Sequence, residues 1–211
     1  VEMFNNMAQQ LESTETLSHD FINNFSHEFK TPIASINGFA KLLKDDKLPE
    51  EEKREYLDII IQESERLSNL AINILTLSKL EQQTILTNKA EYNLSEQIRI
   101  IIGNLYPKWS ARNLTIELEG EDVYICANRE MLDQVWINLL DNAIKFSDEG
   151  GVVSIRVSKG DKLVIRIKDN GIGISPEELP FVFDKFYKSK LRQNAKGSGL
   201  GLAIAKQIAL K

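Results

Sequence analysis

The amino-acid sequence predicts an α+β protein. An antiparallel helical hairpin, forming a dimeric four-helix bundle, is followed by an α/β sandwich whose mixed sheet carries helices on one face. The first 80 residues keep a helical period and contain one glycine, Gly38, whereas the other ten glycines follow residue 100. Strand-like runs occur only in that later part. We therefore expect a hairpin over residues 18–82, a linker over 83–92 and a second domain over 93–211.

The composition is that of a globular protein and narrows the possible functions. Of the 211 residues, 42% are hydrophobic and 27% charged, and the formal net charge is −5. An acidic excess disfavours sequence-independent binding to nucleic acid, which needs a basic surface. With one cysteine, Cys126, and two histidines, the chain has neither an internal disulfide nor a cysteine–histidine zinc site, which fits a reducing, cytosolic compartment. Because the sequence begins at Val1 rather than with methionine, we expect a fragment of a longer protein.

Two amphipathic helices make up the first part. Apolar residues at steps of three and four on the second helix indicate the seam of a coiled coil or helical bundle. Pro49 and the acids after it are typical of a helix start, because the helix dipole favours acids in the first turn. Each helix of a hairpin buries one face, so a second copy completes a four-helix bundle, and we predict a homodimer. The apolar stripes are Phe25, Phe29, Ile33, Ile36, Ala40 and Leu43, and Leu57, Ile60, Ser64, Leu67, Ala71 and Ile74.

The second part mixes the two-residue period of strands with the 3.6-residue period of helices. That mixture predicts a sheet covered by helices on one face. The predicted strands cover residues 114–120, 123–127, 152–158 and 163–168, and the predicted helices cover 128–147 and 199–210.

His27, in the segment SHEFKTP, is the first candidate for chemistry. Pro32 lacks an N–H and crowds the carbonyl of Glu28, so we expect the helix to bend beside His27. Thr31 lies four residues after His27 and therefore on the same face. An exposed neutral imidazole is a nucleophile, and a neighbouring carboxylate can orient its other nitrogen or take its proton. The alternative is a surface histidine beside a helical Thr-Pro pair.

A polar row on the predicted helix over 128–147 is the second candidate. Gln134, Asn138, Asn142 and Lys145 follow one another at steps of four, four and three, opposite the apolar face. Two amides and an ammonium could hold a metal ion and phosphate oxygens. A solvated helix face is the alternative.

The segment DNGIGI, directly after a predicted strand, is the third candidate. The Asp169 carboxylate accepts hydrogen bonds only, so it can select a ligand amino group such as that of adenine. Gly171 and Gly173 lack a Cβ and let the backbone approach a flat base closely. The alternative is an ordinary Asp-Asn-Gly turn.

A glycine-rich entry into the closing helix is the fourth candidate. Gly197, Gly199 and Gly201 lie where free N–H groups and the positive helix end meet a bound phosphate. Their spacing fits neither a Walker loop nor a Rossmann fingerprint. The preceding segment combines aromatic residues, which could anchor it, with cations suited to a polyphosphate. The alternatives are that the aromatic residues pack in the core and that the cations belong to a solvated loop. These residues are Phe183, Phe186 and Tyr187, and Lys188, Lys190, Arg192 and Lys196.

Together, and in this order, these segments resemble the sensor histidine kinases of two-component signalling, and the resemblance covers nearly the whole chain. Residues 1–17 also resemble the end of a HAMP signalling segment. The matching segments are His27–Pro32 for the H box, Asn138–Ser147 for the N box, Asp169–Ile174 for the first glycine box, Phe183–Tyr187 for the F box and Gly197–Leu202 for the second glycine box.

The resemblance implies a dimerising hairpin phosphorylated on His27 and a Bergerat-fold ATP-binding domain. It also implies the site residues. Asn142 would coordinate Mg²⁺ with support from Asn138, and Lys145 would contact phosphate. Asp169 would bind the adenine amino group. The remaining nucleotide-binding candidates are Gly171 and Gly173 at the base edge, Gly197, Gly199, Leu200 and Gly201 in the lid, Tyr187 in the F box, and Lys188 and Arg192 at the γ-phosphate.

The resemblance further implies transfer of the γ-phosphoryl group of MgATP to His27, with Glu28 as base or orienter. The phosphoryl group would then pass to an aspartate of a response regulator. Thr31 fills the position that this family links with phosphatase activity, so we expect a bifunctional kinase and phosphatase. The expected setting is the cytoplasmic portion of a membrane-anchored bacterial receptor.

Two alternatives belong to other classes. An ATP-hydrolysing clamp or chaperone of the same fold places a glutamate four residues before the metal-binding asparagine, where this chain has Asn138. A dimeric scaffold that has lost activity is the second alternative. The family's ATP domain normally continues beyond the last predicted helix, so we expect the sheet here to lack its C-terminal strands.

Overall fold

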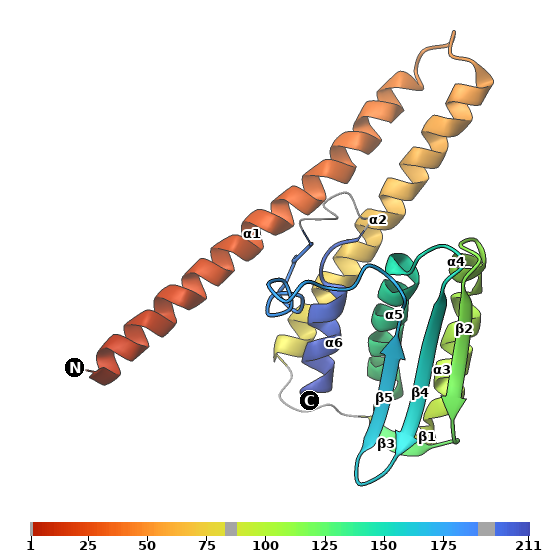
Figure 1. The fold of residues 1–211 in the computed structure, drawn as a ribbon. Coiled ribbons are helices and arrows are strands. Elements are labelled where there is room, and N and C mark those ends of the chain that lie inside the picture. The colour runs from red at the N-terminus through yellow and green to blue at the C-terminus, as the bar shows by residue number, and fades with distance from the viewer. Residues whose placement is uncertain (1, 83–87, 190–196) are drawn as a thin grey trace. The chain divides into compact units, whose positions relative to one another are not determined.

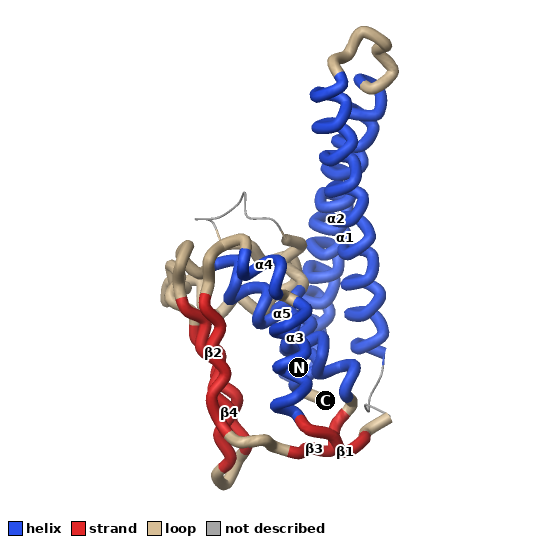
Figure 2. The backbone as a smooth tube through the Cα atoms, turned by 90° about the vertical axis from the view of Figure 1, so that its right-hand side faces the viewer, coloured by secondary structure: helices blue, strands red, loops and turns tan. Residues whose placement is uncertain are grey.

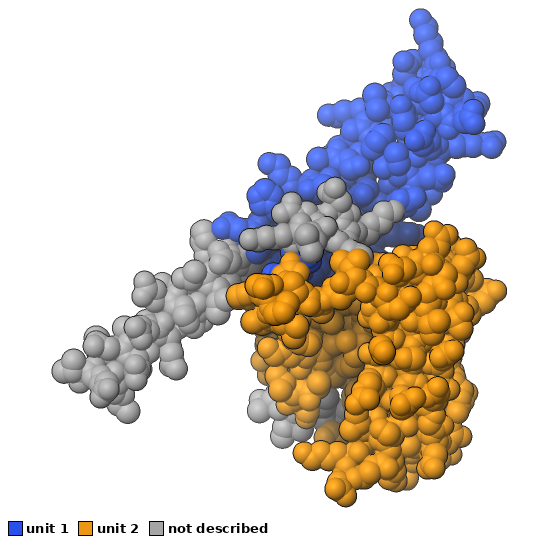
Figure 3. Space-filling model, in the orientation of Figure 1, with its two compact units in different colours: residues 1–75, 185–200 blue, residues 76–184, 201–211 orange. Residues whose placement is uncertain are grey.

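A computed structural model describes the backbone of residues 2–82, 88–189 and 197–211, and the side chains of these segments from residue 22 onward. The chain divides into two compact units (Figure 3). The first consists of residues 1–75 and 185–200, and the second of residues 76–184 and 201–211. Because the last turns of the second hairpin helix belong to the second unit, this division falls earlier than the predicted linker.

The first unit is built on an antiparallel pair of helices, α1 (Glu2–Leu42) and α2 (Glu50–Gln82), as predicted (Figure 1). Three glutamates occupy the first turn of α2, where the helix dipole stabilises them. The Phe39 and Tyr56 rings pack across the pair with centroids 5.1 Å apart. None of the described helices has the length and apolarity that crossing a bilayer requires.

Pro32 does not end the helix beside His27, because α1 continues through it as one helix. The bend expected at this point stays a prediction. Pro32 has no N–H to donate to the Glu28 carbonyl, and the Thr31 hydroxyl donates to a different carbonyl, that of His27, at 3.2 Å. Pro32 is buried, so packing of its ring accompanies the retained helix.

The second unit contains a mixed three-stranded sheet of order β2-β4-β5. Strand β2 (Thr115–Gly120) pairs in parallel with β4 (Val152–Lys159), which pairs antiparallel with β5 (Leu163–Lys168). A separate antiparallel pair joins β1 (Ala90–Asn93) to β3 (Tyr124–Ala127). All four predicted strands are therefore present within two residues of their expected ends.

Helices cover one face of the three-stranded sheet (Figures 1 and 2). They are α3 (Leu94–Asn104), α5 (Arg129–Phe146) and α6 (Gly201–Ala209), with the short α4 (Tyr106–Ser110) after α3. Alternate residues of β4 face this layer and are buried, while the other strand face is exposed. The core consists mainly of Ile98, Ile101, Val135, Trp136, Leu140, Ile144, Val153, Ile155, Val157, Ile204 and Ile208.

Three elements differ from the sequence-based expectation. Strand β1 begins at Ala90, inside the predicted linker over 83–92, because its backbone pairs with β3. Helices α3 and α4 occupy residues to which no element was assigned. The Asn93 side chain caps α3 by accepting from the Glu96 N–H at 3.0 Å, a local signal that the sequence contains.

Candidate active site

His27 lies on α1 in the first unit, with an exposed side chain. Its neighbour Glu28 is much less accessible, with 19% of its side chain exposed. Thr31 is exposed on the next turn, and its hydroxyl donates to the His27 carbonyl. His27 and Glu28 thus lie on one turn of the helix and Thr31 on the next, and the imidazole is open to a reaction partner.

Two cations hold the Glu28 carboxylate. The Arg66 guanidinium, on α2, donates to one carboxylate oxygen at 3.2 Å, and the Lys188 ammonium donates to the other at 2.5 Å. Arg66 also lies 3.5 Å from the Glu63 carboxylate. All four side chains belong to the first unit. Glu28, the residue after His27, is therefore fixed by charge-assisted hydrogen bonds from two segments distant in sequence.

The parts of the F box and of the second glycine box that belong to the first unit pack on each other. Phe186 has a left-handed backbone with φ of +64°, and its N–H donates to the Gly199 carbonyl at 3.0 Å. A Cβ at Gly199 would lie 2.6 Å from the Phe186 carbonyl carbon, so this approach needs glycine. Tyr187 is half-buried, Leu200 is fully buried and Gly197 is exposed. Arg192 lies outside the described residues.

The N-box row lies on α5 in the second unit. The Asn138 amide nitrogen is buried and has no hydrogen-bond partner among the described residues. Asn142 and Lys145, one and two turns further on, are half-exposed. A Cβ at Gly201 would lie 2.9 Å from the Asn138 amide oxygen, so the start of α6 approaches this row closely. The N box and the first residue of α6 therefore lie side by side in this unit.

The DNGIGI turn follows β5 in the second unit. The exposed Asp169 carboxylate accepts a hydrogen bond from the Gly171 N–H at 3.0 Å. A Cβ at Gly171 would lie 2.0 Å from the Phe146 carbonyl oxygen, which places the turn directly against the end of α5. Gly173 has a φ of +70° and faces open space. The turn thus joins the N box while leaving the Asp169 carboxylate accessible.

Family models match both parts of the chain. The His Kinase A (phospho-acceptor) domain model matches residues 17–83, and the model of the histidine kinase-, DNA gyrase B- and HSP90-like ATPases matches residues 127–211. The chain belongs to the sensor histidine kinase family. The family assignment made from the five boxes is confirmed, as is the fold class of helical hairpin and α/β ATPase domain.

Relatives of this histidine kinase are bacterial sensor proteins. The chain is 36% identical over 201 residues to Sensor protein RprX of Bacteroides fragilis, covering 91% of this chain and 39% of RprX. The full-length structure of ShkA in complex with AMPPNP matches with a TM-score of 0.66 and 25% identity, covering 93% of this chain and 40% of ShkA. Histidine kinase ThkA in complex with response regulator protein TrrA has the same fold, with a TM-score of 0.70, 23% identity, and 87% and 57% coverage.

The nucleotide-binding residues of a histidine kinase can be tested against this geometry. The buried, unpartnered Asn138 amide nitrogen is a donor that a phosphate oxygen would satisfy. In the described segments no three His, Cys, Asp or Glu side chains form a metal-binding cluster. Mg²⁺ commonly keeps several waters and takes few protein ligands besides substrate phosphates, so the single amide oxygen of Asn142 is a fitting donor. The residues present therefore fit a Mg²⁺–triphosphate group.

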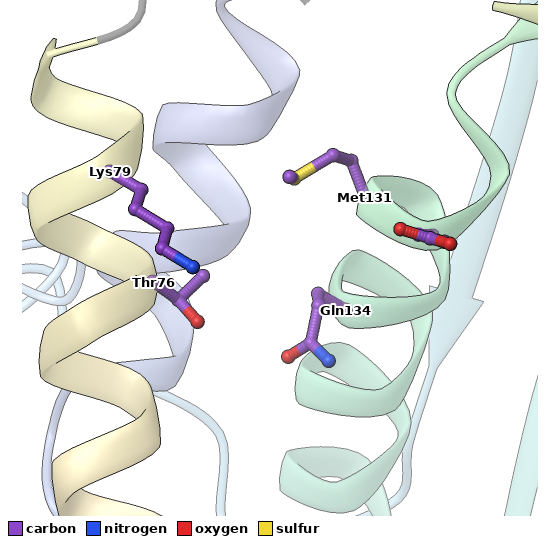
Figure 4. A pocket seen from close by; sticks show the side chains of 5 residues that line it. Thr76, Lys79, Met131 and Gln134 are labelled. Atoms are coloured by element: carbon purple, nitrogen blue, oxygen red, sulfur yellow. The ribbon is translucent and has the colours of Figure 1, made fainter. Parts of the chain in front are cut away.

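A pocket of about 200 Å³ lies in the second unit, away from the glycine boxes in sequence (Figure 4). Thr76 and Lys79 of α2 face Met131 and Gln134 of α5 across it. Lys79 and Glu130 contribute opposite charges to its lining, which gives no preference for a polyphosphate. Gln134 begins the polar row of α5, but here it lines this pocket rather than approaching Gly201 as Asn138 does.

Two arginines of this kinase were not singled out from the sequence. Arg66 binds Glu28 from 38 positions away, and Arg112 binds the C-terminal end of α5 from 32 to 35 positions away. Neither belongs to a local motif, and a hydrogen bond between such distant residues leaves no periodic signal in one sequence. The cap of α5 by Asn128, which accepts from the Met131 N–H at 3.0 Å, is by contrast readable locally.

Proposed function

We propose that this chain is the ATP-dependent autokinase module of a sensor histidine kinase, which phosphorylates its own His27. The single observation that carries the proposal is the exposed His27 imidazole beside a carboxylate fixed by two cations. The chain spans 39% of RprX, so the activity of the whole protein is part of the proposal.

In the proposed reaction, a lone pair on one ring nitrogen of His27 attacks the γ-phosphorus of ATP. A nitrogen–phosphorus bond forms, the bond from phosphorus to the bridging oxygen breaks, and its electron pair leaves with ADP. The opposite ring N–H gains acidity as the ring becomes positive, and Glu28 accepts its hydrogen bond. Since Glu28 is already bonded to Arg66 and Lys188, its role is mainly to orient the ring.

The second unit supplies the nucleotide site in this proposal. Asn138 donates to a phosphate oxygen, Lys145 binds phosphate, and Asp169 accepts the adenine amino group. Gly171 and Gly173 allow the backbone to reach the base edge. A Mg²⁺ ion held by Asn142 would neutralise charge on the phosphates. The AMPPNP complex of ShkA supports an adenine nucleotide as the ligand.

The segment over residues 187–201 forms the lid in this proposal. Lys188 and Arg192 are its cations for the γ-phosphate, and Tyr187 belongs to its apolar anchor. Gly197, Gly199, Leu200 and Gly201 bring backbone N–H groups toward the triphosphate. Lys188 would thus have two roles, one at the γ-phosphate and one at Glu28. The second is supported by its hydrogen bond to Glu28 of the H box.

ATP hydrolysis by a clamp-type mechanism is a weaker hypothesis than autophosphorylation. That mechanism needs a carboxylate to activate water four residues before Asn142. Asn138 occupies the position, and an amide is not a general base. The phosphoryl group is then left for a better nucleophile, which His27 provides.

Incubation with γ-labelled ATP tests the proposal. We expect acid-labile, base-stable label on the protein, and loss of that label in His27→Gln. His19→Gln is the matched control, because His19 and His27 are the two histidines of the chain. Label that persists in His27→Gln would refute His27 as the acceptor. Failure of the wild-type protein to bind ATP would leave only the hypothesis of an inactive dimeric scaffold.

Partners and setting extend the proposal. The receiver domain of a response regulator is the expected phosphoryl acceptor, supported by the ThkA–TrrA complex, and the expected location is the cytoplasmic side of a membrane-anchored receptor. Thr31 would orient water for dephosphorylation of the regulator. In Thr31→Ala that dephosphorylation should fall at least about tenfold while autophosphorylation persists; Thr31→Ser, which keeps the hydroxyl, should retain it.

A homodimer is proposed from the hairpin surface. Leu57, Ile61, Ile72 and Leu75 of α2 are 49%, 54%, 53% and 61% exposed, and they recur at helical spacing. On α1, Ile33 is 44% exposed. A hairpin that leaves such a stripe uncovered gains stability by burying it against a second copy.

A further inference from the structure

The C-terminal end of α5 carries an arginine that the kinase proposal has not used. Arg112 follows α4, and its guanidinium donates three hydrogen bonds: to the carbonyls of Ile144 and Lys145, both at 2.5 Å, and of Ser147 at 2.7 Å. Its own carbonyl accepts from the Gly150 N–H at 3.0 Å. The side chain of this one residue is therefore bonded to the end of the N box, and its main chain to the loop that follows.

The four last carbonyls of a helix lack donors within regular helix geometry, and here the first three of them have identified donors. The Ala143 carbonyl accepts from both the N–H and the hydroxyl of Ser147, at 3.0 and 2.7 Å. The next two, of Ile144 and Lys145, accept from Arg112. The last, of Phe146, faces Gly171. Arg112 thus provides the side-chain cap for the middle pair, and its positive charge suits the negative end of the helix dipole.

This helix end is also where the two nucleotide-binding boxes meet. Gly171 of the DNGIGI turn lies against the Phe146 carbonyl so closely that a Cβ would be 2.0 Å from its oxygen. The side chain of Asn170, the next residue back in the turn, packs against Gly151: a Cβ added at Gly151 would lie 2.3 Å from the Asn170 amide oxygen. The spacing between Lys145 on α5 and Asp169 in the turn is therefore set at the few residues that Arg112 holds.

We propose that Arg112 is a positioning residue for nucleotide binding: by capping α5 it fixes Lys145 and the carbonyl platform on which the Asp169–Gly171 turn rests. The inference rests on the proposed ATP site of this unit. Without the guanidinium, the Ile144 and Lys145 carbonyls form hydrogen bonds with water instead, and the last turn of α5 frays. The residues proposed to contact phosphate and adenine are then no longer held at a fixed distance from each other.

The test compares Arg112→Met and Arg112→Gln with wild type and with Arg156→Met. Arg156 is the matched control, because it is an arginine of the same unit that binds Glu119 on the exposed sheet face. We measure the Kd for MgATP by calorimetry, the kcat and KM of autophosphorylation, the urea midpoint, and hydrogen exchange at residues 144–147.

For Arg112→Met we expect the Kd and KM for ATP to rise about tenfold, with kcat at saturating ATP within about twofold of wild type. Exchange at the end of α5 should accelerate, and Arg112→Gln, which keeps two N–H donors, should recover part of the affinity. Arg156→Met should match wild type in all readouts. A purely structural role would lower the urea midpoint without changing the Kd of the folded fraction.

Wild-type Kd in Arg112→Met, or equal losses in Arg112→Met and Arg156→Met, would overturn the inference. If Arg112→Met does not fold, Arg112→Gln decides alone, and wild-type affinity in it has the same meaning. Failure of wild type itself to bind MgATP would instead refute the proposed function.

Discussion

The Glu28 carboxylate on α1 and the Arg66 guanidinium on α2 form a hydrogen-bonded ion pair across the helical hairpin, with 3.2 Å between Oε2 and Nη2. The pair joins the residue beside the proposed phosphoacceptor to the opposite helix. A carboxylate fixed in this way keeps one direction relative to the helix that carries His27. Arg66 therefore acts on the proposed reaction through Glu28.

Arg66→Gln is expected to lower the kcat of autophosphorylation about tenfold, because Glu28 loses its fixed direction and orientation is a main part of such catalysis. The KM for ATP should stay within about twofold, since Arg66 is not part of the proposed nucleotide site. Initial rates of His27 labelling across an ATP series measure both. Arg54→Gln, at an exposed arginine of the same helix, is the control. A rise in KM with kcat unchanged would contradict this role.

Gly171→Ala is expected to weaken ATP binding at least about 100-fold, because the added Cβ cannot share space with the Phe146 carbonyl 2.0 Å away and the turn must move off α5. Gly103→Ala on α3 is the matched control, as its Cβ would meet nothing within 4 Å. We expect the control to keep wild-type affinity and to gain up to about 1 kcal/mol of stability. Calorimetry and urea unfolding of both variants provide the check, and intact binding in Gly171→Ala would show that the turn does not depend on this packing.

Dimerisation should depend on the exposed stripe of α2. In Ile61→Glu we expect the dimer Kd to rise at least about 100-fold, because burying isoleucine contributes about 1.5–3 kcal/mol and a two-fold interface loses it twice. Light scattering at micromolar concentration should then report the monomer mass. Ile100→Glu is the control, since Ile100 on α3 is also exposed, at 44%. A monomeric wild type, or an Ile61→Glu dimer as tight as the control, would count against the interface.

Elements with a clear apolar period were predictable from the sequence, whereas β1, α3 and α4 were not. Both hairpin helices, α5, α6 and strands β2 to β5 follow from apolar periodicity, because each buries one face. Strand β1 has the sequence AEYN, and α4 has five residues with a proline near its start, so neither shows a clear apolar stripe. Helix α1 continues through Pro32, and burial of the proline ring accompanies the retained helix.

Within the candidate site, residues of one local motif were predictable from the sequence, whereas their partners from distant segments were not. The residues at fixed spacing within one element, such as Asn138 and Asn142, were identified because the chemistry and the helical period coincide. Glu28 was identified as a neighbour of His27, but its two cations were not foreseen as partners. Arg66 and Lys188 lie 38 and 160 positions away, and such contacts follow from the fold rather than from local sequence.

Alkaline stability should depend on Tyr92 of β1. Burial, and then the negative charge of Asp133, raise the pKa of the Tyr92 phenol above its ordinary value of 10.0, while Arg129 and Gln97 oppose the rise. The folded state therefore keeps its proton where the unfolded chain has lost it. Between these two pKa values the unfolded state binds fewer protons, so the free energy of unfolding falls as pH rises above about 10.

Tyr92→Phe removes the titrating group, so this part of the alkaline loss should disappear, while stability near pH 7 changes by less than about 1 kcal/mol. Urea unfolding at a series of pH values from 7 to 11 measures the effect. Tyr124→Phe, at a tyrosine of β3 that is 62% exposed, is the matched control and should keep the wild-type profile. Equal alkaline loss in wild type and Tyr92→Phe would show that the buried phenol retains no more protons in the folded state than in the unfolded chain.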